Sequence, residues 1–433
     1  MSNKQQTSDA MEENKPILVP KLRFPEFREA GEWKPVTLKK ASVPVTERVG
    51  QRKLTPVSIS AGIGFVPQAE KFGRDISGKQ YQLYTLVQDG DFVFNKGNSL
   101  KFPQGCIYLL QDWGQVAAPN VFICFRLKDG YSNGFFQNCF EQNQHGNQLK
   151  KHITSGARSN GLLNISKETF FGVEIPTPSL PEQQKIADCL SSLDELIAAQ
   201  GRKVDALKTH KKGLMQQLFT REGETQPRLR FPEFKNAGVW EIRTIGDIFE
   251  TSAGGTPERS KLEYWNGSIP WVTTSLVDFN VISCAEEFIT TEGLENSSAK
   301  IFPKHTVLVA LIGQGKTRGK VALLDCEAST NQNCAAILPT EVVTPNFTFL
   351  NLCGRYEEIR ALSNTAGQGS LSQGLIRTIP FGFPKDKAEQ QSIADCLSSL
   401  DELITAQTQK LEALKTHKKS LMQQLFPTQK EVA

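Results

Sequence analysis

The chain has 433 residues, which at roughly 100–200 residues per domain predicts two to four domains. Hydrophobic residues make up 39% and charged residues 22% of the chain, a composition that excludes a disordered protein. The formal net charge of +4 is too small by itself to indicate a nucleic-acid binder. No apolar run approaches the ~18 residues of a membrane span, and the polar start lacks the apolar core of a signal peptide. We therefore expect a cytoplasmic protein that does not enter a membrane.

The nine cysteines are scattered, and no two of them form a C-x-x-C pair. This pattern indicates neither a disulfide framework nor a zinc ribbon. We expect buried, reduced thiols and no metal site. Cys189 and Cys396 occupy equivalent places beside a helix seam, where they are interpreted as small core residues.

A long internal repeat organises the sequence. Residues 182–219 match residues 389–426 at 31 of 38 positions, with an offset of 207. The hexapeptide LRFPEF at residues 22–27 recurs at residues 229–234 with the same offset, and Trp33 and Trp240 continue the register. Two separate matches at one offset indicate that a whole unit was duplicated.

Between the repeated segments lie about 140 residues in each half, and these two stretches are almost unrelated in sequence. Both contain short apolar runs bounded by Gly, Pro, Asn and Asp, which are typical of strands with some helix between them. The clearest runs are residues 90–97, 120–127, 305–313 and 320–325. The expected fold class is therefore α/β or α+β, with two globular domains.

The repeated segment follows a heptad pattern over five heptads, which favours a coiled-coil seam. Its 38 residues would span about 57 Å as a helix. Since one chain carries both copies, the simplest arrangement is an antiparallel pair related by a pseudo-two-fold axis. Gln200 and Gln407 then lie at mid-helix core positions, where we expect them to meet and set the helix register. Homodimerisation through the same heptads is the alternative.

Catalytic motifs are weak in this sequence. Residues 310–317 (ALIGQGKT) fit a relaxed phosphate-loop pattern, but a second strand pattern follows where a helix should begin, which favours a hairpin turn. His210 and His417 occupy equivalent T-H-K-K strings that are typical of an exposed helix face. Motifs for serine hydrolases, zinc proteases, zinc deaminases and methyltransferases do not occur. We expect no catalytic residues in this chain.

Charge differs between the two unlike halves. Residues 35–178 carry a net charge of +6, whereas residues 242–385 carry −2. If both halves contact DNA, the second must cluster its positive residues or use neutral donors and acceptors. The candidate stretches are residues 95–101, 156–164, 256–266, 316–320 and 367–373, each of which can equally be a solvated loop. The candidate contact residues are Lys96, Asn98, Lys101, Arg158, Asn160, Arg259, Lys261, Lys316, Arg318, Lys320, Gln368 and Ser370.

The duplicated LRFPEF, the L-P-E-Q-Q-K-I-A entry into a long helix and the block GGTPERSKLEYWNGSIPW at residues 254–271 together resemble the specificity subunit of type I restriction–modification enzymes. The resemblance covers nearly the whole chain. The sequence departs from the family's pattern at two places. The second helix is entered through P-K-D-K-A-E-Q-Q, and the first half lacks a GGTP block.

The resemblance implies two target-recognition domains that each read one half of an asymmetric DNA target, while the helices set the spacing. It divides the chain into a polar tail (1–20), a first target-recognition domain (21–180), a helix (181–220), a second domain (221–387), a second helix (388–427) and a short tail (428–433). The implied partners are double-stranded DNA, two modification subunits and two restriction subunits. No cofactor is expected in this chain, whereas the partners are expected to use S-adenosylmethionine, ATP and Mg²⁺. A coiled-coil adaptor whose heads bind proteins is the alternative.

Overall fold

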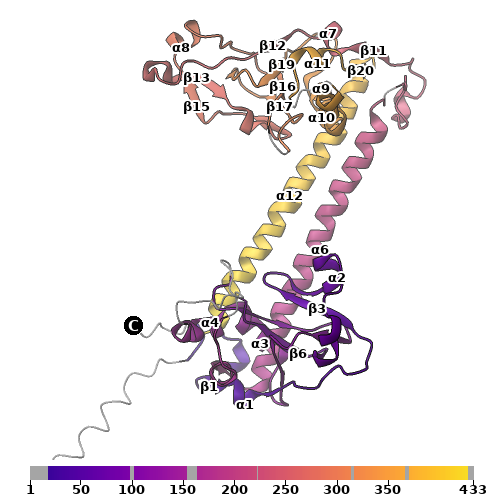
Figure 1. Cartoon of the computed structure of the whole chain (residues 1–433). Helices are drawn as coiled ribbons and strands as arrows, with labels where there is room; N and C mark the ends of the chain where they lie inside the picture. Colours follow the sequence, from indigo (N-terminus) through magenta and orange to yellow (C-terminus); the bar gives the residue numbers. More distant parts are fainter. Residues whose placement is uncertain are drawn as a thin grey trace, which may run out of the picture. The chain divides into compact units, whose positions relative to one another are not determined.

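The computed structural model describes residues 18–97, 102–153, 163–221, 223–313, 316–365 and 370–427 (Figure 1). The chain divides into two compact units. Unit 1 contains Met1–Ala199 and Leu411–Ala433, and unit 2 contains Gln200–Lys410. The two long helices, α6 (Leu180–Leu218) and α12 (Lys387–Leu425), each contribute residues to both units.

Unit 1 contains two four-stranded sheets and one strand pair. The first sheet has the order β2-β9-β6-β7, the second has the order β4-β3-β8-β5, and β1 pairs with β10. The strands are β1 (Lys34–Thr37), β2 (Ser42–Pro44), β3 (Thr55–Ser60), β4 (Gly64–Pro67), β5 (Thr85–Gln88), β6 (Asp91–Asn95), β7 (Cys106–Leu109), β8 (Gln115–Ala118), β9 (Ile123–Leu127) and β10 (Glu174–Thr177). The short helices are α1 (Leu38–Ala41), α2 (Gln68–Phe72), α3 (Asn133–Glu141), α4 (Gln144–Leu149) and α5 (Lys167–Phe171).

Unit 2 has a five-stranded sheet of order β12-β19-β16-β17-β14, a three-stranded sheet of order β15-β13-β18, and the pair β11-β20. The strands are β11 (Glu241–Thr244), β12 (Thr251–Ala253), β13 (Trp265–Val272), β14 (Asn280–Ile282), β15 (Glu287–Ile289), β16 (Val307–Ala310), β17 (Val321–Leu324), β18 (Ser329–Thr330), β19 (Cys334–Ile337) and β20 (Pro380–Phe383). The helices are α7 (Ile245–Ile248), α8 (Thr291–Glu295), α9 (Pro345–Gly354), α10 (Tyr356–Thr365) and α11 (Gln373–Arg377).

The two units share a common strand order although their sequences differ, and in the described residues they differ in one strand each, since β5 occurs only in unit 1 and β14 only in unit 2. The order β2-β9-β6-β7 recurs as β12-β19-β16-β17, and β4-β3-β8 recurs as β15-β13-β18. The β3–β8 and β13–β18 pairs are both parallel, whereas the neighbouring β3–β4 and β13–β15 pairs are antiparallel. The expected mixed fold with two heads is confirmed. The pairing also shows that β3 is the counterpart of β13, although the first head lacks the GGTP block.

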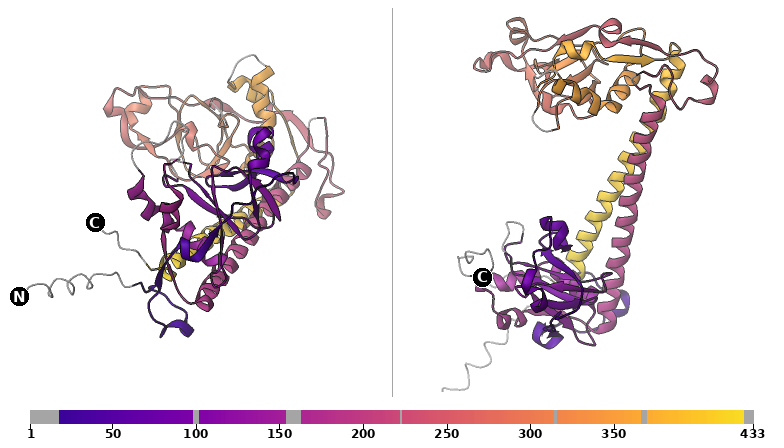
Figure 2. Two further views of the ribbon diagram at one scale, coloured as in Figure 1. Left: turned by 60° about the horizontal axis from the view of Figure 1, so that its bottom comes forward. Right: turned by 45° about the vertical axis from the view of Figure 1, so that its right-hand side comes forward.

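The parts of α6 and α12 within each unit lie side by side (Figure 2), and in unit 2 they run antiparallel, because Gln200 meets Gln407 while Lys211 meets Asp401. In unit 2 the Gln200 Nε2 atom donates to Gln407 Oε1 at 3.0 Å and to the Gln407 backbone oxygen at 2.9 Å, so the expected meeting of the glutamines is present. The lysine at a core position of each helix is paired across the seam. The Lys211 Nζ lies 2.5 Å from Asp401 Oδ1 in unit 2, and the Lys418 Nζ lies 2.7 Å from Asp194 Oδ1 in unit 1.

A buried latch explains why LRFPEF and the E-Q-Q helix entry recur together. In unit 1 the Arg23 Nε and Nη2 atoms each lie 2.7 Å from a Glu182 oxygen, and the Trp33 indole N–H donates to the same carboxylate at 3.3 Å. Unit 2 repeats this arrangement with Arg230, Glu389 and Trp240, at 2.7, 2.7 and 3.2 Å. The hydrogen bonds that Arg23 donates to Glu182 raise the pKa of the guanidinium, because they stabilise its charged form.

The glutamine that follows the latch glutamate holds the first turn of a helix. The Ser132 backbone N–H at the start of α3 donates to Gln183 Oε1 at 2.9 Å, and the Thr344 N–H at the start of α9 donates to Gln390 Oε1 at 2.8 Å. A helix start leaves backbone N–H groups without partners inside the helix, and these side chains supply one. The E-Q pair therefore fastens each head to the start of a long helix.

The predictions for single histidines and cysteines are partly confirmed and partly corrected. His210 and His417 are exposed on their helices, as predicted. The buried thiols Cys106, Cys124, Cys139 and Cys334 fit the expectation for cysteines. Cys284 corrects it, because this thiol follows the sheet-edge strand β14 and is exposed. Cys189 and Cys396 are half-buried beside the seam, so they are not fully core residues.

Candidate DNA interface

Three loops of unit 2 meet at Leu311, directly after β16. The Leu311 N–H donates to the Asn333 backbone oxygen at 2.8 Å, and the Leu371 N–H donates to the Leu311 oxygen at 2.8 Å. These bonds join the β16–β17 connection, the β18–β19 connection and the segment that leads to α11. The described part of the candidate stretch 367–373 is thereby joined to the β16–β17 connection, which contains the candidate stretch 316–320, while residues 367–369 lie outside the described residues.

Unit 1 brings the counterpart loops together in the same way. The Leu163 N–H donates to the Lys96 backbone oxygen at 2.8 Å, which joins the β6–β7 connection to the segment that leads to α5. Lys96 lies directly after β6, as Leu311 lies directly after β16. Five candidate residues lie outside the described residues, namely Asn98, Lys101, Arg158, Asn160 and Gln368.

The two glycines of the GGTP segment in unit 2 are packed too tightly to be replaced by a larger residue. A Cβ on Gly254 would lie 2.0 Å from the Thr330 backbone oxygen, and one on Gly255 would lie 2.3 Å from the Ser298 carbonyl carbon. The Trp271 indole N–H donates to the Gly255 oxygen at 2.9 Å, and the Gly255 N–H donates to the Thr330 oxygen at 2.8 Å. Gly254 and Gly255 are thus held against β18, whereas residues 258–263 of the candidate stretch 256–266 are exposed.

Two candidate cations of this block are held by aromatic rings. The Arg259 guanidinium lies 3.8 Å from the Trp265 ring centroid and also forms an ion pair with Glu287. The Lys261 Nζ donates to the Tyr264 hydroxyl at 2.9 Å, and this hydrogen bond raises the pKa of the lysine. The rings restrict the cations to a few geometries, and both side chains remain on the surface.

A network of neutral polar side chains connects these loops, and the sequence reasoning did not single it out. The Asn331 Oδ1 accepts from the Thr274 hydroxyl at 2.8 Å and from the Asn333 N–H at 3.0 Å. The Thr256 hydroxyl donates to Gln332 Oε1 at 2.6 Å, and Gln332 is exposed. The string T-N-Q-N at residues 330–333, directly before the apolar strand β19, was the available signal. We call Thr256, Thr274 and residues 331–333 the polar cluster.

The β16–β17 connection is a hairpin turn, because the two strands pair antiparallel with Leu308 opposite Ala322. No helix follows residue 317, which excludes the phosphate-loop interpretation and confirms the predicted turn. Lys316 is exposed, whereas the Lys320 Nζ lies 2.6 Å from Asp278 Oδ1. Arg318 and Ser370 are half-buried.

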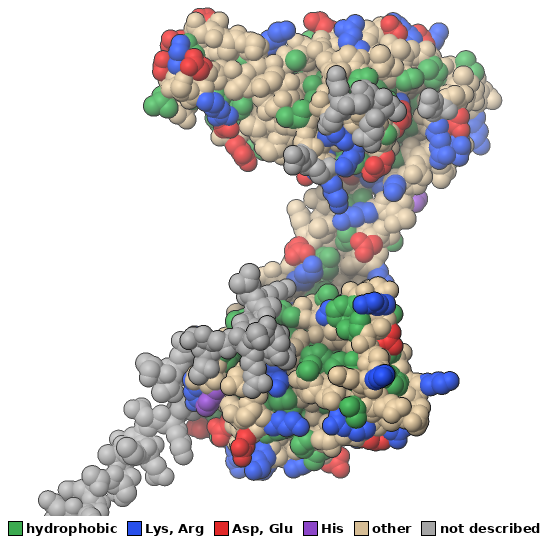
Figure 3. Space-filling model, viewed as in Figure 1, with side chains coloured by type: hydrophobic (Ala, Val, Ile, Leu, Met, Phe, Trp, Pro, Cys, Tyr) green, Lys and Arg blue, Asp and Glu red, His purple; other side chains and the backbone are tan. Residues whose placement is uncertain are grey.

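Positive charge on unit 2 is largely compensated. Arg259 and Lys320 both have carboxylate partners, and Figure 3 shows Lys and Arg side chains interspersed with Asp and Glu side chains on the face in view. A patch of this kind can contact phosphates only at isolated points. Sequence-dependent contacts would therefore depend on neutral side chains, which can read base edges.

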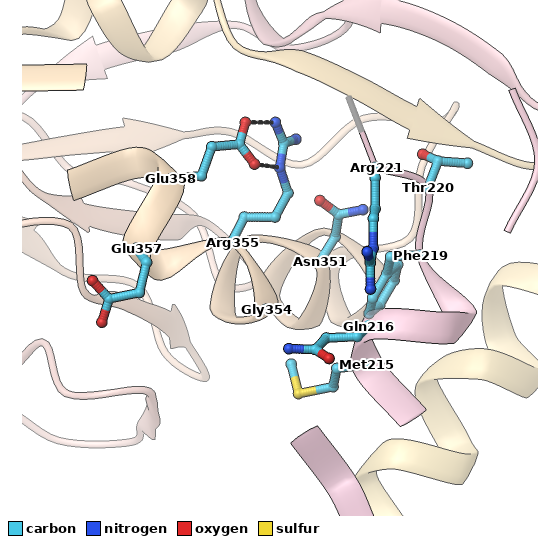
Figure 4. Close-up of a pocket in the computed structure, with 10 residues that line it drawn as sticks. All are labelled: Met215, Gln216, Phe219, Thr220, Arg221, Asn351, Gly354, Arg355, Glu357 and Glu358. Atoms are coloured by element: carbon cyan, nitrogen blue, oxygen red, sulfur yellow. Dashed lines mark hydrogen bonds and ion pairs between the residues drawn. The ribbon is translucent and has the colours of Figure 1, made fainter. Parts of the chain in front are cut away.

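A pocket of about 590 Å³ lies between the end of α6 and the α9–α10 junction (Figure 4). Arg355 and Glu358 at its wall form an ion pair with each other, with the Arg355 Nε 2.8 Å from Glu358 Oε2. The lining residues contain no His, Ser or Cys.

No group of three or more His, Cys, Asp or Glu side chains in the described residues could hold a metal ion. Within the same residues no helix is both long and apolar enough to cross a bilayer.

The family model described as "Type I restriction modification DNA specificity domain" matches residues 88–209 and 237–416. The chain is 27% identical over 254 residues to the type I restriction enzyme EcoR124I/EcoR124II specificity subunit of Escherichia coli, covering 57% of this chain and 60% of that protein. It is 29% identical over 193 residues to the MjaIX specificity subunit of Methanocaldococcus jannaschii, covering 42% of this chain and 44% of that protein. Both matches span less than two thirds of the relative's length.

Solved structures share the fold. The crystal structure of the S subunit of a type I restriction–modification system from M. genitalium superposes with a TM-score of 0.55 at 14% identity, over 95% of this chain and all of that one. A structure from a study of complex assembly in a type I restriction–modification system superposes with a TM-score of 0.56 at 14% identity, over 91% of this chain and 97% of that chain.

Proposed function

The chain belongs to the type I restriction–modification DNA specificity family, and from this premise we propose that it is the DNA specificity subunit of such a complex. Each head reads one half of an asymmetric, bipartite target in double-stranded DNA. The paired long helices set the spacing between the two half-sites. They also dock two modification subunits, and the complex further holds two restriction subunits.

The observation that carries this proposal is the equivalence of the loop sites on two unlike heads. Both units join the same pair of loops after the same central strand, through the Leu163–Lys96 and Leu371–Leu311 hydrogen bonds. The residues in these loops differ, with a basic first head and a nearly neutral second head. Two heads with the same strand framework but different loop residues are suited to recognising two different DNA half-sites.

The chemistry of the complex belongs to its partners in this proposal. The modification subunits would use S-adenosylmethionine to methylate adenine, and the restriction subunits would use ATP and Mg²⁺. This chain supplies binding and position only.

The spacing role can be tested by lengthening both helices together. Seven residues inserted directly after Gln200 and a matching seven directly before Gln407 keep the heptad seam and the Gln200–Gln407 contact and add about 10 Å of helix, the length of roughly 3 base pairs. Methylome sequencing of cells that express the variant with its partners should show unchanged half-site bases and a longer gap. Altered half-site bases with an unchanged gap would refute the proposal.

The matched control is Gly201→Thr, which copies the residue at the equivalent position of the second helix, Thr408. No atom lies within 4 Å of a Cβ built on Gly201, so the substitution should disturb nothing. The control should leave both the half-sites and the gap as they are in the unmodified protein.

A further inference from the structure

Two cysteines of unit 2 follow neighbouring strands in the same register. Strands β14 and β17 are parallel, with Asn280 opposite Ala322 and Ile282 opposite Leu324. Continuing this register by two residues places Cys284 opposite Cys326. The last pair is held by the Asp325 N–H, which donates to the Ile282 oxygen at 2.9 Å, two residues before Cys284 and one before Cys326. The Cys326 sulfur itself lies 4.0 Å from that oxygen.

This placement fits the geometry of a disulfide. Neighbouring strands lie about 4.8 Å apart, and disulfides join Cα atoms that are about 4.4–6.8 Å apart. Residues at opposite positions of a strand pair also point their side chains to the same face of the sheet. The two sulfur atoms can therefore meet with little movement of the backbone.

The surroundings of the two thiols favour a disulfide over the other roles of a cysteine pair. All nine cysteines lie in the described part of the chain, and Cys284 alone among them is exposed. Cys326 is half-buried, and its pKa is raised first by burial and then by the charges of Asp325 and Cys284. In the described residues no third His, Cys, Asp or Glu completes a metal site with them. Cys284 is accordingly the thiol that meets a reagent first, and Cys326 is the thiol that resolves the product.

We propose that Cys284 and Cys326 form a reversible disulfide, so that this edge of the second head is a site of oxidative modification. The oxidant is a small-molecule disulfide. The Cys284 thiolate attacks one of its sulfur atoms and releases one small thiol, which leaves a mixed disulfide on Cys284. The Cys326 thiolate then displaces the second small thiol. The protein loses two protons and two electrons, and the oxidant is reduced to two thiols.

The bond would fasten an otherwise weakly held strand. Strand β14 is three residues long and lies at the edge of its sheet, where it pairs with β17 alone. The segment before it carries Asp278, the ion-pair partner of Lys320 in the β16–β17 turn. Oxidation would thus restrict the chain that neighbours the polar cluster, whether or not that cluster binds DNA.

The experiment uses the full chain, reduced and then freed of reductant. Oxidised glutathione is added, and peptides are mapped by mass spectrometry without reduction. The expected result is one linked pair of peptides that contain Cys284 and Cys326, which dithiothreitol separates. Hydrogen exchange at β14 should slow at least tenfold in the oxidised form. Cys326→Ser should instead accumulate glutathione on Cys284.

The proposal is overturned if the unmodified chain keeps glutathione on Cys284 while Cys326 stays reduced, or if Cys284 links two chains. Cys284→Ser serves as the matched control, because its side chain is exposed and the change leaves the core intact. This variant should form no linked peptide. Its hydrogen exchange at β14 should stay fast both with and without oxidised glutathione. Loss of the link in this variant together with an unchanged circular dichroism spectrum separates chemistry from misfolding.

Discussion

The latch at the start of α6 yields a quantitative prediction for Glu182→Gln. The Glu182 carboxylate is 1% exposed and accepts both Arg23 hydrogen bonds at 2.7 Å, while the Arg23 side chain is 8% exposed. The amide that replaces the carboxylate presents N–H groups to a guanidinium that only donates, and it leaves that buried cation without a counter-charge. Breaking a buried pair on one side typically costs about 3–5 kcal/mol, so unit 1 should lose roughly this much stability.

The assay must report on each unit separately, because a chain with two compact units need not unfold in one step. Native-state hydrogen exchange across a urea series does so, read on the amides of β6 for unit 1 and of β16 for unit 2. Glu182→Gln should lower the opening free energy at β6 and leave that at β16 nearly unchanged. Glu389→Gln should show the reverse pattern, because its contacts are equivalent.

The control is Glu26→Gln in the same unit. Glu26 pairs with Lys185 at 3.1 Å, but these side chains are 45% and 51% exposed. Exposed pairs contribute about 0–1 kcal/mol, so this variant should scarcely change the exchange at β6. A loss at Glu182→Gln as small as that of the control would refute the reasoning that the latch holds the head to the helix.

Three further predictions concern stability and binding. Gly254→Ala should destabilise unit 2 by more than 2 kcal/mol in urea unfolding, because its Cβ would lie 2.0 Å from the Thr330 oxygen, whereas Gly201→Ala in open helix should stabilise by up to about 1 kcal/mol. Burial lowers the pKa of His145 to about 4, so the unfolded chain binds a proton there between roughly pH 6.5 and 4 that the folded chain does not. The stability of unit 1 should fall by about 3 kcal/mol as the pH falls through this window, and pH-dependent unfolding of His145→Leu should lack that loss. Arg259→Ala should weaken DNA binding about tenfold in salt titrations, whereas Arg228→Ala, at an exposed ion pair with Glu224, should not.

Sequence reasoning succeeded where a pattern has one physical meaning. A heptad with a glutamine at each centre predicted that Gln200 and Gln407 meet, and they do. The strand pattern after residue 317 predicted a hairpin instead of a phosphate loop, which the β16–β17 pairing confirms. Such patterns depend on local period and side-chain polarity, both of which can be read along the chain.

The sequence indicated the charged residues of the candidate interface but not its neutral ones. Basic stretches in both heads pointed to the loops after β6 and β16, although Arg259 and Lys320 prove to be paired with Glu287 and Asp278. The polar cluster was missed, since Thr274 and Asn331 are far apart in the sequence and carry no charge.

The repeat of 207 residues, the long helices and the unequal charge of the two halves were determined by the sequence alone. The tertiary structure decided that both heads share a core strand order, that the loops after equivalent strands are joined by equivalent hydrogen bonds, and that the GGTP glycines are packed against β18. The physical reason is that strand pairing is made by backbone groups, which every residue carries. Two unlike sequences can therefore build the same sheets and leave no shared residues by which to recognise them.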